Sequence, residues 1–274
     1  MKSIFSITTF LLVETLAIAQ AQPFPDPIPS HDSLLIHSTR LGETRTVNIW
    51  IPPSYTNGKE PFPVLYMLDG GIQEDFPHLA NTIDTLIQTN QIPPIILVGI
   101  ENTQRRRDLT GPTTVKKDKK IAPVVGGSEA FRAFVNEELI PEINKRYRTT
   151  NTRGIIGESL AGLFVTETFL LQPEMFDIYI AFDPSLWWNN TYLLKTAKQH
   201  LAGFPASPKT FWFAGSNTKD IYKNAGKLAD ALEGQPIPNL RWKYSPEKAE
   251  HHNTIFRATK ERALIWSWNS EVHP

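Results

Sequence analysis

Ser159 lies at the centre of the stretch RGIIGESLAGLF and is the residue best placed to act as a nucleophile. An apolar run precedes it and a helical pattern follows it, so the stretch predicts a strand, a tight turn and a helix. Such a turn exposes the serine hydroxyl, and the N–H of the next residue, Leu160, can bind a developing oxyanion. The residue types indicate acyl transfer by a serine, with Ala161 and Gly162 in place of the usual G-x-S-x-G ending.

A second oxyanion donor is expected in the loop that follows an earlier strand. The run YMLDGG ends in Gly70 and Gly71, and glycines there allow the backbone to approach a substrate oxygen. We choose the N–H of Gly71, with Gly70 as the neighbouring alternative. A diglycine turn without any chemical role is the competing interpretation.

A serine hydroxyl needs a general base, and the strand-turn-helix arrangement places that histidine late in the chain. His251 and His252 are adjacent in KAEHHNTIF, between an apolar-polar run and a helix. The acid that orients the histidine is expected after the preceding strands. Asp220 is our choice, in the loop after KTFWFAGS, and Asp183 after IYIAF is the rival. Each aspartate has a purely structural alternative, as a helix cap or a turn residue.

The elements that must position these residues alternate along the chain. Strand-length apolar runs are separated by helical patterns, which predicts an α/β fold with a mostly parallel, doubly wound sheet in a single domain. A strand from an antiparallel edge is expected in RTVNIWIPPSY, and a helix over residues 128–147 with Ser128 as its N-cap. Ligands of such sheets bind at the carboxyl ends of the strands, where every candidate above falls.

The first residues have the pattern of a secretory signal. Lys2 precedes an apolar run that ends in small residues, so we expect cleavage near residue 21 and a domain over residues 22–274, exported to the bacterial periplasm or beyond. The mature chain has no expected membrane span. The chain has no cysteine, which excludes disulfides and thiolate metal sites, and 28 basic residues balance 28 acidic ones, which argues against a nucleic-acid partner.

Several of these motifs resemble a known family. The segments PFPVLYMLDGG, VGIENTQRRRDLTGP, FDPSLWWNN and EHHNTIF, together with the serine stretch, occur in the order and spacing of the putative esterase family. This family is related to esterase D and includes siderophore esterases of the enterobactin and salmochelin type. The resemblance extends from about residue 35 to the last helix and implies an α/β-hydrolase fold.

The resemblance also assigns residues. It places the nucleophile on Ser159 and the oxyanion donor on Gly71, and it favours His252 over His251. It puts Arg107 and Trp187 on the substrate side, against the alternatives of an ion pair with Asp108 and a packed tryptophan pair. Ala161 and Asn253 stand where the family usually has glycine, and some siderophore-esterase relatives work without a clear acid.

The resulting hypothesis is a serine esterase whose partner is a small-molecule ester, such as a siderophore or sugar ester, and whose chemistry requires no cofactor and no metal. An acyltransferase on the same scaffold and a non-catalytic binding protein are the alternatives. Nothing in the sequence indicates an oligomeric state.

Overall fold

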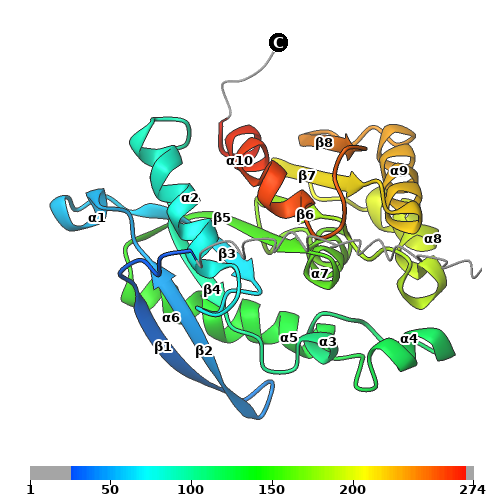
Figure 1. Ribbon diagram of the computed structural model, residues 1–274, viewed down its shortest axis with the longest axis horizontal. Coiled ribbons are helices and arrows are strands. Elements are labelled where there is room, and N and C mark those ends of the chain that lie inside the picture. Colours follow the sequence, from blue (N-terminus) through cyan, green and yellow to red (C-terminus); the bar gives the residue numbers. More distant parts are fainter. Residues whose placement is uncertain (1–25, 270–274) are drawn as a thin grey trace, which may run out of the picture.

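Eight strands form one sheet in the computed structural model of this protein, in the order β1-β2-β4-β3-β5-β6-β7-β8 (Figure 1). The structure describes residues 26–269, so the expected signal segment, residues 1–21, lies outside it. The strands are β1 Asp32–Ser38, β2 Glu43–Trp50, β3 Phe62–Leu68, β4 Ile96–Ile100, β5 Thr149–Glu158, β6 Ile178–Phe182, β7 Lys209–Ser216 and β8 Leu240–Glu247.

The sheet is parallel from β4 to β8 and antiparallel only at the end that β1 and β2 form. The predicted α/β class with a mostly parallel, doubly wound sheet is therefore confirmed. The antiparallel strand predicted in RTVNIWIPPSY is β2, but β1 lies outside it and is the true edge. The sequence pattern did not predict β1, because the apolar residues of this strand are not its buried ones. Leu35, for example, is 74% exposed.

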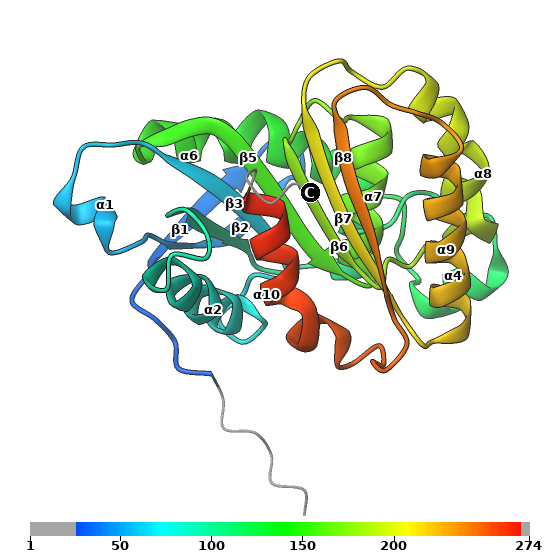
Figure 2. The same ribbon diagram turned by 90° about the horizontal axis from the view of Figure 1, so that it is seen from above.

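Helices cover both faces of the sheet (Figure 2). Side chains alternate along β3, so Leu65 and Met67 pack with α2 and α10, whereas Val64 and Tyr66 pack with the helices of the other face. The helical segments are α1 Ser54–Asn57, α2 Phe76–Gln88, α3 Arg105–Asp108, α4 Lys116–Ile121, α5 Ser128–Phe134, η1 Val135–Leu139, α6 Ile140–Arg146, α7 Leu160–Leu171, α8 Trp188–Ala202, α9 Lys219–Glu233 and α10 Ile255–Trp268. Within residues 26–269 no helix is long and apolar enough to cross a bilayer.

The helix predicted over residues 128–147 is present but divided. Gly127 rather than Ser128 is its N-cap residue, and a π-helical segment, η1, separates α5 from α6. Pro141 lies in the first turn of α6 and has no N–H to donate to the preceding turn. A π-helical turn at this point is a common way for a helix to continue past such a missing hydrogen bond.

The start of α8 is strained. Asn189, Asn190 and Thr191 are consecutive residues in the left-handed region, with φ of 47°, 54° and 59°. Asparagine tolerates this region, but a left-handed conformation costs about 1–2 kcal/mol for most residues, and β-branched threonine is among the least suited to it. The three residues lie directly after Trp188, so the backbone is distorted next to the tryptophan pair.

Replacing Thr191 by glycine is expected to raise the free energy of unfolding by about 1 kcal/mol, because glycine adopts the left-handed region without a steric penalty. Calorimetric melting measures the change. The matched control is Thr196→Gly, further along α8 at a position with regular helical geometry, which should lower stability by about 0.5–1 kcal/mol. A lower melting temperature for Thr191→Gly would contradict the strained conformation.

Candidate active site

Ser159 occupies the sharp turn between β5 and α7. Its φ is 61° and its ψ is −115°, a conformation that L-residues rarely adopt. Gly157 makes the turn possible, because a Cβ atom at that position would lie 2.7 Å from the Cβ of Ala161. The strand and the helix thus lie so close together that only glycine fits at residue 157.

The turn does not need a glycine at residue 161. Ala161 is fully buried, and its methyl group packs into the space that Gly157 leaves. The glycine is needed one residue later, since a Cβ at Gly162 would lie 2.7 Å from the carbonyl oxygen of Phe182. Gly162 therefore lets α7 pack against the end of β6, while alanine is sufficient at the turn itself.

Three side chains from three strand ends form a hydrogen-bonded chain. The Oγ of Ser159 lies 3.1 Å from His252 Nε2, and His252 Nδ1 lies 2.9 Å from the Oδ2 of Asp183. Ser159 follows β5, Asp183 follows β6, and His252 lies in the loop after β8. β5, β6, β7 and β8 are successive parallel strands of the sheet, so the three residues lie at the same edge of it.

The structure corrects the predicted acid, because Asp183 and not Asp220 contacts the histidine. The Asp183 carboxylate is fully buried, and it accepts hydrogen bonds from the Ser216 N–H at 2.5 Å and the Ser216 hydroxyl at 2.7 Å. Asp220 is exposed in the first turn of α9. Both aspartates follow a strand and precede the histidine, so chain order alone did not separate them.

The structure brings His252 to the serine and leaves His251 exposed on the same turn. The turn is fixed by Thr254, whose hydroxyl accepts the His251 N–H at 3.0 Å and donates to Glu250 at 2.8 Å. The hydrogen bond that His252 donates to the Asp183 carboxylate, and the negative charge of that carboxylate, raise the pKa of His252 above its usual value. Asn253 is exposed on this turn.

The two predicted oxyanion donors follow two paired parallel strands, Gly71 after β3 and Leu160 after β5. Leu160 is the first residue of α7, so its N–H is one of the four that have no partner within the helix. The Gly71 N–H donates to the Glu74 carboxylate at 2.7 Å. The N–H of Gly70, the alternative donor, bonds the backbone carbonyl of Ile100 at 2.9 Å.

Arg105, which the sequence analysis did not single out, connects the two loops that carry the predicted oxyanion donors. Its guanidinium binds both carboxylate oxygens of Asp69, at 2.5 and 2.7 Å, and reaches the carbonyl of Glu158 at 3.3 Å. Asp69 directly precedes Gly70, and Glu158 directly precedes Ser159. A bidentate arginine pair of this kind fixes orientation as well as charge.

Arg107, predicted on the substrate side, is committed to neighbouring carboxylates. It lies 2.7 Å from Glu43 and 2.6 Å from Asp108, and Asp108 also pairs with the buried Arg45. The hydrogen bond to Glu43 and the charges of both carboxylates raise the pKa of Arg107 above its usual range. The guanidinium therefore stabilises the loop that carries α3, in agreement with the ion-pair alternative.

Trp187, the other predicted substrate residue, lines a pocket of about 500 Å³. Its ring centroid is 5.9 Å from that of Trp188, and Trp188 is the buried member of the pair. Ser185, two residues earlier, places its Oγ 3.5 Å from the Oγ of Ser159. The exposed Asp220 lines the same pocket, so it lies near the site without touching the histidine.

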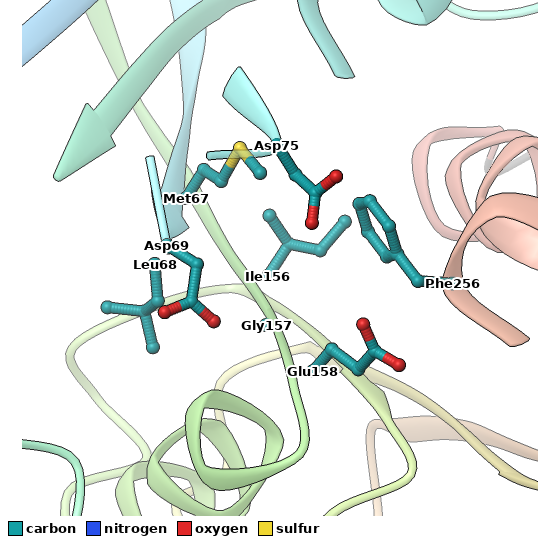
Figure 3. A pocket seen from close by; sticks show the side chains of 8 residues that line it. All are labelled: Met67, Leu68, Asp69, Asp75, Ile156, Gly157, Glu158 and Phe256. Atoms are coloured by element: carbon teal, nitrogen blue, oxygen red, sulfur yellow. The ribbon is translucent and has the colours of Figure 1, made fainter. Parts of the chain in front are cut away.

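A smaller pocket adjoins the serine turn on the side of α2 and α10 (Figure 3). Carboxylates from Asp69, Asp75 and Glu158 surround it together with the Phe256 ring. Burial raises the pKa of Glu158 to about 7, and the neighbouring carboxylates act in the same direction while His252 opposes them. No group of three metal-ligating side chains occurs in the part of the chain that the structure describes.

The sheet order, the strained serine turn and the histidine loop together define an α/β-hydrolase. The family model described as "Putative esterase" matches residues 38–269. The chain therefore belongs to the putative esterase family, and it is a carboxylic ester hydrolase.

Individual proteins agree with this assignment. The chain is 30% identical over 256 residues to the ferri-bacillibactin esterase BesA of Bacillus subtilis, an alignment that covers 85% of this chain and 86% of that protein. It is 28% identical over 196 residues to a siderophore triacetylfusarinine C esterase of Aspergillus fumigatus, covering 65% and 63%. The crystal structure of an IroE-like serine hydrolase from Shewanella oneidensis matches with a TM-score of 0.77 at 26% identity, covering 87% and 80% of the two chains.

The raised pKa of Glu158 predicts a pH-dependent stability. The pKa of Glu158 is 4.5 in the unfolded chain and about 7 in the folded protein. Between these two pH values the folded state binds the Glu158 proton more tightly than the unfolded state does, so the free energy of unfolding falls as the pH rises. Glu158→Gln removes the buried charge and should be more stable than the native protein at pH 8, by roughly 3 kcal/mol at most, and equally stable at pH 4.

Denaturant unfolding at the two pH values measures this difference. Glu60→Gln, at an exposed loop position, is the matched control and should show no comparable gain at pH 8. An equal effect of Glu158→Gln at both pH values would contradict the raised pKa.

Proposed function

We propose that this esterase cleaves its substrate through a catalytic triad of Ser159, His252 and Asp183 with an acyl-enzyme intermediate. The observation that carries the proposal is the continuous chain of contacts, 3.1 Å from serine to histidine and 2.9 Å from histidine to aspartate. These are the distances at which a general base can take a serine proton and a carboxylate can hold the imidazole in the required orientation.

In the proposed reaction, Ser159 Oγ attacks the ester carbonyl carbon while His252 Nε2 takes the hydroxyl proton. Asp183 stabilises the imidazolium through Nδ1–H. The tetrahedral intermediate then expels the alcohol, which leaves with the proton that His252 returns. A water molecule, deprotonated by His252, attacks the acyl-serine, and the collapse of the second intermediate releases the acid and regenerates Ser159.

We assign the oxyanion to the N–H groups of Leu160 and Gly71. The Leu160 N–H lies at the start of α7, where the helix dipole also favours a negative charge. The Gly71 N–H bonds the Glu74 carboxylate in the structure. In this proposal the carbonyl oxygen of the substrate takes the place of the Glu74 carboxylate, which keeps its second partner, the Asn102 amide at 2.6 Å.

The proposed substrate is the ester backbone of a siderophore. Two relatives support this class, because both are named as siderophore esterases, one for ferri-bacillibactin and one for triacetylfusarinine C. The screen that tests it compares ferric and iron-free siderophores with feruloyl and acetylated sugars. We also propose export, on the basis of the signal-like pattern in residues 1–21, so that the enzyme meets its substrate outside the cytoplasm.

Ser159→Ala should lower the turnover of 4-nitrophenyl acetate roughly 10⁴-fold or more, because it removes the hydroxyl that forms the acyl intermediate. It should also abolish labelling by a fluorophosphonate probe. Ser185→Ala is the matched control, since its hydroxyl lies 3.5 Å away from Ser159 Oγ and has no assigned chemical step. Retained turnover in purified Ser159→Ala would refute the proposed nucleophile.

Asp183→Asn should lower kcat roughly 10²- to 10⁴-fold, because the amide neither holds the productive tautomer of His252 nor stabilises its charge. The pKa of His252 should fall as well, so the acid limb of kcat/KM shifts to lower pH. Asp220→Asn removes the same charge at the rival position and should change neither quantity appreciably. A larger loss in Asp220→Asn than in Asp183→Asn would reverse the assignment.

A further inference from the structure

The pocket beside Trp187 has walls from three helical segments. The first wall is α4 and the residue before it, with Val115, Lys117, Asp118 and Ile121. The second is the start of α8, with Trp187 and Asn190. The third is the start of α9, with Thr218, Asp220 and Ile221. Two of these walls begin within a few residues of the triad. Trp187 follows Ser185, and Thr218 follows Ser216, whose hydroxyl holds Asp183.

The α8 wall cannot keep its shape through its own backbone preferences. Asn189, Asn190 and Thr191 are all left-handed, and each relaxes by returning to the right-handed region unless an external contact opposes it. These three residues directly follow the tryptophan pair, so any relaxation would move Trp187 and Asn190, which line the pocket.

Asp118 provides the external contact. Its carboxylate is 2% exposed, and Oδ2 accepts the backbone N–H of Asn189 at 2.8 Å and the hydroxyl of Thr113 at 2.8 Å. Asp118 belongs to α4, so this one carboxylate joins the first wall of the pocket to the second. Asp118 and Asn189 are 71 residues apart in sequence. The helices that carry them, α4 and α8, lie on the same side of the molecule in Figure 1.

Asp118 differs from its neighbours on α4. Lys116, Lys117, Lys119 and Lys120 are exposed, whereas Asp118 is buried between them. A buried carboxylate is unfavourable unless its oxygens are hydrogen-bonded. Its donors are the Thr113 hydroxyl and the Asn189 N–H, so the position of α4 and the strained backbone of α8 stabilise each other.

We infer that Asp118 is a positioning residue that fixes the left-handed segment of α8 and thereby sets the width of the Trp187 pocket, which selects esters with a bulky, planar group on that side. This inference rests on the proposed hydrolytic function of the neighbouring triad. Asp118 touches neither Ser159 nor His252 in the structure. Its effect is therefore on the binding of large groups and not on the chemical step.

The test measures kcat and KM of Asp118→Ala for two pairs of esters. One pair, 4-nitrophenyl acetate and 4-nitrophenyl 2-naphthoate, enlarges the acyl group, and the other, phenyl acetate and 2-naphthyl acetate, enlarges the alcohol. In one of the pairs, kcat/KM for the naphthyl ester should fall at least about tenfold relative to its small partner, mostly through KM. Equal losses for all four esters, or no loss, would overturn the inference.

Two control variants separate positioning from a general loss of structure. Asp118→Asn keeps one acceptor oxygen for the Asn189 N–H and should retain the native selectivity. Lys119→Ala, on the exposed side of α4, should leave selectivity unchanged. Loss of selectivity in Lys119→Ala, or a loss in Asp118→Asn as large as in Asp118→Ala, would also contradict the role of this hydrogen bond.

Crystal structures of the native protein and of Asp118→Ala keep the inference testable even without turnover. We expect residues 189–191 to leave the left-handed region in the variant and the Trp187 ring to move. An unchanged segment would overturn the inference, whatever the kinetics. A native protein inactive on every ester would instead refute the proposed function, and the structural comparison would still decide the role of Asp118.

Discussion

The buried carboxylate of Asp183 is the interaction on which the rest of the site depends. It lies at the end of β6 with φ of 42°, and it holds both the end of β7, through Ser216, and the loop after β8, through His252. Removing it would leave the histidine without its orienting partner and the Ser216 donors unpaired. Because β6 is the neighbour of β5 in the sheet, the same residue also fixes how far the histidine lies from Ser159.

The sheet and the serine turn were predictable from the sequence because short-range patterns determine them. Apolar runs of strand length identify β3 to β7, and Gly157 with Gly162 marks a turn where α7 must approach two strands closely. The acid was not predictable in the same way. Asp183 and Asp220 both follow a strand, and only the order of β5, β6 and β7 in space decides which of them reaches the histidine.

The residues that the sequence analysis missed act through partners far away in the chain. Arg105 pairs with Asp69 and reaches Glu158, 36 and 53 residues away, and the neighbouring Arg107 faces Glu43 instead. The three consecutive arginines cannot be told apart by sequence. Their different partners follow from the side of α3 on which each side chain lies. The left-handed start of α8 is equally hidden, since nothing local favours Thr191 in that conformation.

Two carboxylates flank His252, and their surroundings give them different tasks. Asp183 accepts three hydrogen bonds, two from Ser216 and one from the imidazole, so its negative charge is stabilised beside the ring. Glu158 lies among the carboxylates of Asp69 and Asp75, and its pKa rises to about 7. The Glu158 carboxyl therefore titrates near neutral pH. Asp183 is the carboxylate that the fold holds in place at the ends of β6 and β7, and this is the geometry that a proton transfer through His252 requires.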